Sequence, residues 1–564
     1  MKEVTTLQGL NLQSEISTTV IKIPKTEPVS ELLELIKNFH PIFIDEYFFE
    51  ENTLTIRSKL AFLWKELAET LIKLSKDSIT YEEARKYAVE EIIKERIASM
   101  STIPLLYSAY KEGFEVNPTL LRNDRVTYTK TFNRQYTIGA GKGSQIIYSI
   151  SSSKDSKNAK EIQRDKWASN LMIEGLALPI PKWEILETEE EIEKIWETFE
   201  KPVVIKPTGL TGGSGVSTSI NSVEQAKKAF NIAKQATSKH TGKTWQEKIM
   251  IQEQVDGEDY RLLVIDGKLE IVTKRIPAFV SGDGKSSIGQ LITETNNDPR
   301  RDVLNPSHTL KPIKIDQPLL DFLEEQKISL EYVPKKDEKI TVRKVASMSQ
   351  GGITEDFTDK VSPEVKYIVE SIASSIHAFV IGADILCKDI SRPLTKDNGG
   401  ILEINTMPEA YLNFYPVIGE NREYVADTYI EKLLKGNITK RIVVLGQFTK
   451  DIPTLLRQRS LFKSYLSEED TVGEYKEGDL LINSLKINDE LDKEKAIESL
   501  KINASLDAII IHHRNWQEVE DSGLGFDKID MLVISQELSQ EKEYFSIVRK
   551  YRRKRLIDKI KILK

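Results

Sequence analysis

Residues 201–219 read KPVVIKPTGLTGGSGVSTS, an apolar run typical of a β-strand that reaches Lys206 and then leads into four glycines. Glycine allows backbone N–H groups to close on phosphate oxygens, and a lysine at the end of the strand adds a fixed positive charge. The segment is not a P-loop, because its lysine precedes the glycines. The segment is consistent with a phosphate site of another type. A flexible turn without a ligand is an equally open alternative.

Oxygen-bearing side chains further along the chain form a candidate cation site. Glu403 and Asn405 lie two positions apart in GGILEINTMPEA, so they point to the same face of the expected strand. Asp384, in FVIGADILCKD, could complete the set from a neighbouring strand. Hard oxygen ligands suit Mg²⁺, which would bridge the β- and γ-phosphates of a nucleotide. An acid at a strand end is often only solvated, and Asp384 alone would fit that alternative.

A strand-to-turn hinge lies between these two segments. Residues 248–268 read KIMIQEQVDGEDYRLLVIDGK, in which an apolar strand ends at Gln252 and Glu253, a turn follows at Gly257, and Asp259 comes next. Backbone groups at such a hinge suit the edge of an adenine ring, and a nearby acid can accept hydrogen bonds from ribose hydroxyls. The closing DGK predicts a tight hairpin and therefore antiparallel sheet.

Length and composition indicate several folded domains. The 564 residues exceed the ~250 at which a single core usually stops growing. Hydrophobic residues make up 39% and charged residues 30%, an ordinary globular balance. We find no apolar run near the ~18 residues of a transmembrane helix and no signal-peptide core, so we expect a cytoplasmic protein with no membrane partner. Cys387 is the only cysteine, which excludes an internal disulfide.

The charge pattern gives no sign of a nucleic-acid partner. The net charge is −7, with acidic and basic residues interspersed. The last stretch, RKYRRKRLIDKIKILK, is locally basic, but no recognition motif accompanies it. We interpret this stretch as a solvated helix.

The pattern of elements divides the chain into three expected domains. Residues 1–160 combine a β-type run with two helical stretches, which predicts a mixed α/β domain. Within its end, SSSKDSKNAKE is polar and turn-rich, typical of a linker or mobile loop. Residues 161–436 alternate short β-rich runs with helices, which predicts an α+β domain on antiparallel sheet. Residues 437–564 carry buried-looking strands between helices, which predicts a small parallel α/β domain.

The glycine loop, the hinge and the acidic strands together resemble the ATP-grasp fold, in which two α+β halves grip ATP. Residues 269–301, LEIVTKRIPAFVSGDGKSSIGQLITETNNDPRR, are more specifically similar to the ATP-grasp half of cyanophycin synthetases. ASMSQGGITEDFTDKVSPEV and the segment around GGILEINTMPEAYLNFYPVIGE are similar to the same half, and YTIGAGKGSQIIYSI to its entry segment. The resemblance covers roughly residues 135–436.

The resemblance implies roles for individual residues. Lys166 and Lys206 would bind the α- and β-phosphates, Asp384, Glu403 and Asn405 would hold two Mg²⁺ ions, and Arg275 would act with Lys206 in catalysis. An immobile guanidinium suits the charge of an acyl phosphate and its tetrahedral intermediate. The expected ATP-binding set, from the phosphate lysines through the loop to the hinge and the ribose acid, is Lys166, Lys206, Thr208, Gly212, Gly213, Ser214, Gly215, Val216, Gln252, Glu253, Val255 and Asp259.

The loops that would contact the amino-acid or peptide substrate depart from the family pattern. Ser347 stands where an asparagine is usual, and residues 212–214 replace a His-Gly-Arg-like run. A surface role remains an equal alternative for the two adjacent arginines of this set. The expected substrate-binding residues are Arg300, Arg301, Arg343, Ser349, Gly351 and Gly352.

The last domain resembles a degenerate and truncated Mur ligase. VVLGQFTKDI takes the place of a Mur P-loop but has neither the glycine-lysine pair nor the hydroxyl that would hold Mg²⁺. His513 takes the place of a metal-binding glutamate. His512 and His513 are adjacent on an expected strand and point to opposite faces, so a shared metal is not expected.

These observations predict an ADP-forming carboxylate–amine ligase with one active site, which uses ATP and Mg²⁺ to form an amide bond through an acyl phosphate. Its substrate would be an amino acid or short peptide, and polymerisation of a dipeptide such as β-aspartyl-arginine is one option. We also expect a homo-oligomer. The alternative is a non-catalytic pseudoenzyme or a binding subunit of a peptide-synthesising complex.

Overall fold

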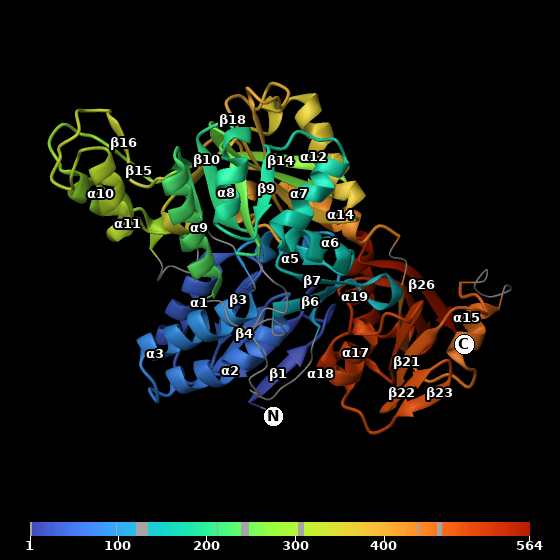
Figure 1. Ribbon diagram of the computed structural model, residues 1–564. Coiled ribbons are helices and arrows are strands. Elements are labelled where there is room, and N and C mark those ends of the chain that lie inside the picture. The colour runs from blue at the N-terminus through green and yellow to red at the C-terminus, as the bar shows by residue number, and fades with distance from the viewer. Residues whose placement is uncertain are drawn as a thin grey trace. The chain divides into compact units, whose positions relative to one another are not determined.

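The computed structural model describes residues 3–97, 99–119, 134–210, 213–238, 248–302, 309–436, 439–458 and 465–564 (Figure 1). The chain forms two compact units, one made of residues 1–152 with 426–564 and the other of residues 153–425. The division into three domains stays a prediction. Within the described ranges, no helix combines the length and the apolar character needed to cross a membrane.

The unit of residues 153–425 contains a four-stranded antiparallel sheet of order β11-β10-β12-β9. Apolar side chains of β10 and β12 pack against α8 and α9 on one face, with Val203 and Ile251 fully buried. Lys206 and Gln252 alternate with these residues and therefore face the other way. The elements are β9 (Trp183–Leu186), α8 (Glu190–Ile195), β10 (Val203–Pro207), β11 (Ser217–Ile220), α9 (Val223–Ser238) and β12 (Ile249–Glu253).

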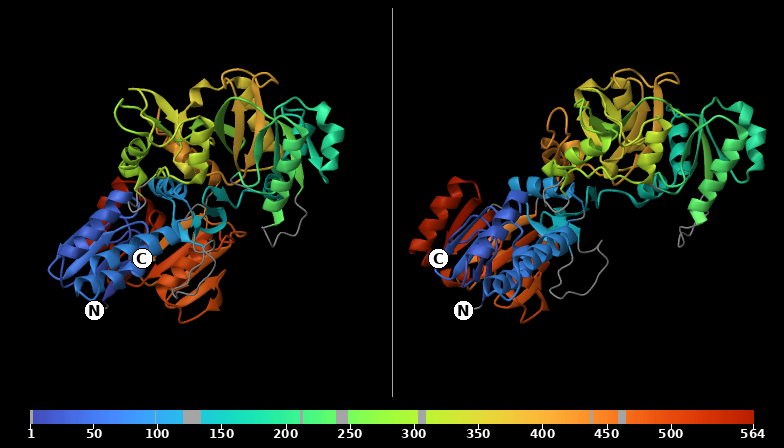
Figure 2. Two further views of the ribbon diagram at one scale, coloured as in Figure 1. Left: turned by 60° about the vertical axis from the view of Figure 1, so that its left-hand side comes forward. Right: turned by 90° about the vertical axis from the view of Figure 1, so that its left-hand side faces the viewer.

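A five-stranded antiparallel sheet of order β17-β14-β13-β18-β19 lies beside it, as Figure 2 shows for this unit. The expected DGK hairpin is confirmed, because β13 pairs with β14 through a turn in which Asp266 and Gly267 have φ values of 50° and 71°. One face of the sheet packs against α7 and α12 around Leu262, Ala383 and Ile404. The elements are α6 (Lys157–Arg164), α7 (Lys166–Gly175), β13 (Glu258–Ile265), β14 (Lys268–Ile276), β17 (Ile353–Asp356), α12 (Pro363–Ser375), β18 (Val380–Cys387), β19 (Gly399–Asn405) and α13 (Tyr411–Phe414).

Residues 278–342 form a small lobe of the same unit (Figure 1). Its own core joins Val280, Ile288, Leu319 and Val342. Ser287 begins the first helix with a capping box, in which its hydroxyl accepts from the Gln290 N–H. The elements are β15 (Phe279–Ser281), α10 (Ile288–Asn296), α11 (Gln317–Glu325) and β16 (Lys339–Thr341).

The other unit begins with a four-stranded antiparallel sheet of order β1-β2-β4-β3, followed by helices and a second small sheet, β5-β6-β7-β8. The helices pack on the first sheet through residues such as Leu33, Trp64 and Leu67, which are fully buried. The elements are β1 (Val4–Leu7), β2 (Thr18–Lys22), α1 (Glu27–Phe39), β3 (Glu46–Glu50), β4 (Thr53–Arg57), α2 (Ala61–Ser75), α3 (Tyr81–Arg85), the π-helix η1 (Lys86–Ile93), α4 (Lys94–Arg96), α5 (Thr102–Lys111), β5 (Val116–Pro118), β6 (Gln135–Ile138), β7 (Gln145–Tyr148) and β8 (Ser151–Ser152).

The last part of this unit is a seven-stranded sheet of order β23-β22-β21-β24-β20-β25-β26. β21, β24, β20, β25 and β26 are parallel, which confirms the expected parallel character of this region. A buried ion pair of 2.7 Å between Lys501 Nζ and Glu115 Oε2 ties it to the first part of the chain. The elements are α14 (Tyr424–Leu433) at the unit boundary, β20 (Lys440–Leu445), α15 (Ile452–Arg457), β21 (Val472–Lys476), β22 (Asp479–Ile482), β23 (Leu485–Asn488), α17 (Lys493–Ile502), β24 (Ala508–His513), α18 (Trp516–Ser522), β25 (Ile529–Ser535), α19 (Lys542–Arg553) and β26 (Ile557–Leu563).

Two local expectations were wrong. The basic end of the chain is helical only as far as Arg553, and residues 557–563 form the edge strand β26, which pairs with β25. The polar run at 151–161 is not a loop throughout, because Ser156 caps the start of α6 with a side-chain oxygen that accepts from the Ala159 N–H.

Candidate active site

One face of the five-stranded sheet is polar. Asp384 on β18 and Glu403 on β19 are direct cross-strand partners, and Asn405 lies two positions further along β19. Because side chains alternate along a strand, these three share a face. Asp384 is also the cross-strand partner of Arg261 on β13, and Asp259 is the partner of Arg275 on the next strand.

Two arginines neutralise the buried carboxylate at the centre of this face. Asp384 is 8% exposed. Its Oδ2 lies 3.0 Å from Arg275 Nη2 and 3.1 Å from Arg261 Nη2. Arg275 also donates to Asp259 Oδ1 at 2.6 Å. Burial, opposed by the charge of Arg275, raises the pKa of Asp259.

Arg261 was missed by sequence reasoning. Its position two residues after Asp259, on a strand whose next neighbour carries Asp384, was the available signal. For Arg275, burial alone would lower the pKa, but Asp384 and Asp259 outweigh it and raise the pKa. The guanidinium therefore stays charged and fixed in direction.

The two lysines of the expected phosphate site lie close to Glu403. Lys166 begins α7, and its Nζ donates to the Leu210 carbonyl at 2.8 Å and lies 3.7 Å from Glu403 Oε1. Lys206 Nζ donates to Gln252 Oε1 at 2.7 Å. Burial, followed by the charge of Lys166, lowers the pKa of Lys206 to about 8, while Glu403 acts in the opposite direction.

The surroundings of these lysines contain polar groups that a bound nucleotide could satisfy. Lys206 is only 8% exposed and faces two other charged groups. Gln252 is 2% exposed, and its Nε2 has no hydrogen-bond partner among the described residues. A buried ammonium and an unpaired amide donor are both groups that phosphate oxygens or a base edge can satisfy.

The glycine loop joins β10 to β11. Gly213 and Gly215 have φ values of 77° and 72°, and a Cβ on Gly215 would lie 2.9 Å from Pro207 Cγ. Only glycine fits there without strain. Thr208 is fully buried and its carbonyl accepts from the Lys166 N–H at 3.0 Å, which anchors the start of the loop.

The rest of the loop is more open. Ser214 and Val216 follow in the same turn, and Val216 is 38% exposed. Gly212 lies outside the described residues.

The expected adenine hinge continues from β12. Glu253 Oε1 accepts from the Glu200 N–H at 3.0 Å, and Val255 is half-buried in the turn that follows. Gly257 has a φ of 146°, and a Cβ there would lie 2.3 Å from the Cys387 backbone. The turn is therefore held against β18, close to the polar face.

The donor set on the polar face suits a hard cation. Asp384, Glu403 and Asn405 supply carboxylate and amide oxygens from adjacent strand positions, the ligand type that Mg²⁺ prefers. A second acidic cluster of the described residues consists of Asp356, Asp359 and Glu420, and Arg422 forms an ion pair with each of the three.

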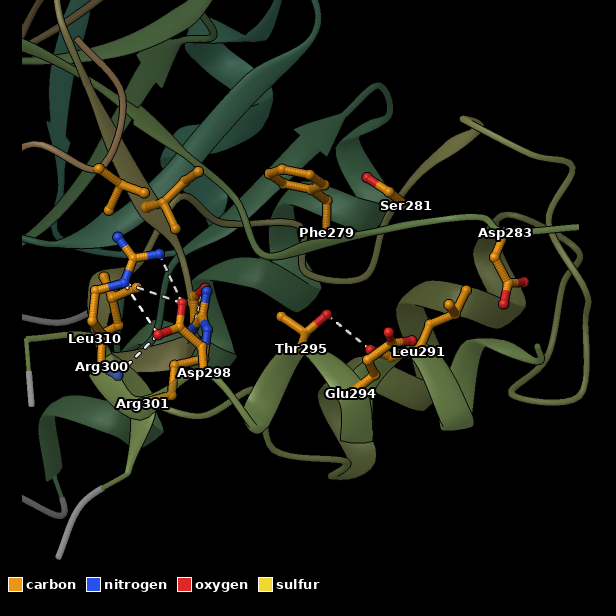
Figure 3. A pocket seen from close by; sticks show the side chains of 13 residues that line it. Phe279, Ser281, Asp283, Leu291, Glu294, Thr295, Asp298, Arg300, Arg301 and Leu310 are labelled. Atoms are coloured by element: carbon orange, nitrogen blue, oxygen red, sulfur yellow. Dashed lines mark hydrogen bonds and ion pairs between the residues drawn. The ribbon is translucent and has the colours of Figure 1, made fainter. Parts of the chain in front are cut away.

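A cavity of about 410 Å³ opens between the small lobe and the sheet (Figure 3). Arg300 is exposed and pairs with Asp298 at 2.7 Å, whereas Arg301 is 6% exposed and donates to the Gly351 carbonyl at 3.0 Å. The lining residues include Phe279, Asp283, Leu291, Glu294, Asp298, Arg300, Arg301 and Gly351.

Three of the expected substrate residues lie outside this lining. Arg343 is 3% exposed and pairs with Asp316 at 2.7 Å. Ser349 shares a hydrogen bond of 2.9 Å with Ser347, and Gly352 follows the same turn.

Comparisons with known proteins agree with this architecture. Residues 163–276 match the family model of the ATP-grasp (A) domain of phosphoribosylglycinamide synthetase. Cyanophycin synthetase from Synechocystis sp. is 32% identical over 310 residues, which cover 55% of this chain and 34% of that protein. The glutathione biosynthesis bifunctional protein of Clostridium perfringens is 30% identical over 330 residues, which cover 57% of this chain and 40% of that protein.

A solved bifunctional glutathione synthetase from Pasteurella multocida aligns at 22% identity with a TM-score of 0.46, over 64% of this chain and 46% of that one. The chain spans about a third of the length of the cyanophycin synthetase that it matches. The expected ATP-grasp fold is confirmed by the family model and by the two antiparallel sheets of residues 153–425. Residues 163–276 therefore match an ATP-grasp domain, and about half of the chain is similar in sequence to cyanophycin synthetases.

Proposed function

We propose that the chain is an ADP-forming ligase that joins a carboxylate to an amine with ATP and Mg²⁺. The observation that carries this proposal is the charge cluster in which buried Lys206 and half-buried Lys166 lie near Glu403, with Asp384 opposite Glu403 on the neighbouring strand. Two cations beside a set of oxygen ligands suit a polyphosphate with its metal ion. Bound Mg²⁺ would supply charge neutralisation on the transferred phosphate.

Lys206 and Lys166 would hold phosphate oxygens, and Gly213–Val216 would cover them. Asp384, Glu403 and Asn405 would hold the cations. The Gln252 amide and the Glu253–Val255 hinge would meet the base, and Asp259 is assigned to the ribose side. Because Asp259 also holds Arg275, its carboxylate would serve both partners.

Arg275 is the proposed electrostatic group of the acyl-transfer step. Asp259 and Asp384 fix its guanidinium on the polar face. A guanidinium that is already oriented stabilises developing negative charge without reorganisation in the transition state. Arg261, held by the same carboxylate of Asp384, joins it in this role.

The cavity of the small lobe is the proposed substrate site. Asp283 and Glu294 on its wall form no ion pair with any described residue, and hydrogen bonds from the Ser286 and Lys285 backbone lower the pKa of Asp283 to about 2. These two acids suit a substrate with an amino or guanidino group. An amino acid or short peptide, such as the dipeptide β-aspartyl-arginine, has that chemistry, whether it is added once or polymerised.

The test is ADP release by the purified chain with ATP, Mg²⁺ and a panel of amino acids and dipeptides, followed by mass spectrometry of the products. We expect an amide product and one ADP per bond. Glu403→Gln should abolish ADP formation, while Glu324→Gln on the exposed side of α11 should leave it unchanged. Full function in the cell with Glu403→Gln, and no ADP release by the wild-type chain, would favour a binding subunit instead.

A further inference from the structure

The parallel sheet at the end of the chain has a crevice at the carboxyl ends of three neighbouring strands. β21, β24 and β20 lie side by side and run in the same direction, so their carboxyl ends share one edge. Residues 446–450 follow β20, residues 477–478 follow β21, and Arg514 follows β24. All three segments line a cavity of about 930 Å³.

This edge is a topological switch point, where the connections after two neighbouring strands lead to opposite sides of the sheet. After β20 the chain passes through α15 to β21, and after β24 it passes through α18 to β25, on the other side of β20. α15 packs with Ile510 on one face, whereas α18 packs with Ile511 on the opposite face. The loops after β20 and β24 therefore lead to opposite faces of the sheet and leave a crevice between these two strands. Open α/β sheets bind their ligands in such a crevice.

A half-buried ammonium lies inside the crevice. Lys493 Nζ lies 2.9 Å from His513 Nδ1, 3.4 Å from Glu518 Oε2 and 6.0 Å from the centre of the Tyr475 ring. Burial, followed by the charge of Lys493, lowers the pKa of His513 well below its usual value, so His513 is neutral at pH 7 and accepts from the ammonium. Burial also lowers the pKa of Lys493, which makes a further negative partner favourable.

The rim of the crevice adds basic side chains. Lys450 and Lys476 are exposed and form no ion pair within the described residues 439–458 and 465–564. Arg514 forms an ion pair with Glu518, the same carboxylate that pairs with the half-buried ammonium of Lys493. The cavity wall carries four basic and three acidic side chains: Lys450, Lys476, Lys493 and Arg514, with Glu477, Glu518 and Asp521.

We propose that this crevice binds a small organic anion, a carboxylate or a phosphate ester, whose charge lies against Lys493 and the two rim lysines. Its volume falls in the range of small-molecule sites, about 300–1,000 Å³. A nucleotide triphosphate fits the turn after β20 poorly, because the Gly446 N–H already donates to the His513 carbonyl at 2.8 Å and no glycine-lysine pair follows. The inference does not depend on the proposed ligase activity.

The test is isothermal titration of the full chain with succinate, inorganic phosphate and AMP, each as a separate probe. Binding of succinate alone would identify a carboxylate site, and binding of phosphate or AMP a phosphate site. Lys450→Glu reverses an exposed rim charge without disturbing packing. We expect it to weaken binding about tenfold, the effect of losing one charge-assisted contact of about 1.4 kcal/mol. Lys493→Met should weaken binding further.

Two controls locate the binding. Lys495→Glu changes an exposed lysine of the same helix, α17, that does not line the cavity, and should leave the affinity unchanged. Lys206→Met removes a proposed phosphate lysine of the ATP-grasp unit, so any AMP or phosphate binding that it abolishes belongs to that unit and not to the crevice. The proposal is overturned if no probe binds the wild-type chain, if Lys450→Glu and Lys493→Met bind as tightly as Lys495→Glu, or if Lys206→Met abolishes the binding of every probe.

Discussion

The polar face of the antiparallel sheet and the crevice of the parallel sheet hold charged groups in different ways. On the antiparallel face, charges project from the middle of strands, and each is fixed by a cross-strand partner, as Asp384 is by Arg261 and Arg275. In the crevice, charges follow strand ends, where exposed loops supply partners such as Arg514. A charge in the middle of a sheet needs an oppositely charged partner on the neighbouring strand. A charge at a strand end can be substituted with a smaller loss of stability.

Among the substitutions that test this difference, Asp384→Asn should have the largest effect on stability and activity. It leaves Arg261 without its carboxylate partner and Arg275 with only Asp259. Removing one partner of a buried charge network costs about 3–5 kcal/mol in the free energy of unfolding. ADP formation should fall by about 1,000-fold or more because a proposed cation ligand is lost as well.

Urea unfolding and a coupled ADP assay measure the two effects. Asp321→Asn, on the exposed surface of α11, is the matched control and should change neither. A stable and active Asp384→Asn variant would mean that cross-strand compensation is not what holds the polar face together.

Lys206→Met tests the buried ammonium beside Glu403. Loss of a contact to a transferring phosphate should lower kcat/KM for ATP by about 100-fold. The pKa of Lys206 is lowered to about 8, so the wild-type free enzyme loses this charge as pH rises through 8, and kcat/KM for ATP should fall above that pH.

Lys206→Arg keeps a permanent charge at this position and should remove that alkaline decline, even if its activity is lower. The measurement is the pH profile of kcat/KM between pH 6 and 10, about four pH units around the expected pKa. An unchanged alkaline limb in Lys206→Arg would assign the decline to another group.

Glu294→Gln tests the cavity wall, where charges are exposed. It should raise KM for an amine- or guanidine-bearing substrate by between about 1.4-fold and fivefold with little change in kcat, since an exposed ion pair contributes about 0.2–1 kcal/mol. A dipeptide without a cationic side chain should show no difference between the variant and the wild type. Equal increases for both substrates would place the cationic group elsewhere.

The strand pattern predicted much of the antiparallel unit. Alternation along GGILEIN put Glu403 and Asn405 on one face, and the structure places Asp384 directly opposite Glu403. The DGK hairpin followed from local turn chemistry. The pairs of Arg261 and Arg275 with Asp384 could not be predicted, because they depend on the register of strands more than 100 residues apart.

Pairing between strands that are distant in the sequence also determined the structure of segments whose local pattern fitted more than one element. Residues 557–563 read IDKIKIL, a mixture of isoleucines and charged residues that fits a strand as well as the end of a helix, and parallel pairing with β25 selects the strand. The crevice depends on which strands become neighbours in the sheet. The two adjacent histidines illustrate this dependence. His512 lies 3.0 Å from Glu474 on one face of the sheet, and His513 lies 2.9 Å from Lys493 on the other.

Lys493→Met gives the smallest expected effect on stability, although the same substitution should weaken anion binding. Methionine keeps the apolar length of the side chain next to Tyr475, and Glu518 retains Arg514 as a partner. The desolvation cost of the ammonium disappears together with its ion pair, so the free energy of unfolding should change by less than about 1 kcal/mol. Urea unfolding beside Lys495→Met measures this difference. A loss as large as that of Asp384→Asn would show that the crevice charges are as tightly compensated as those of the antiparallel face, and the contrast between the two sheets would not hold.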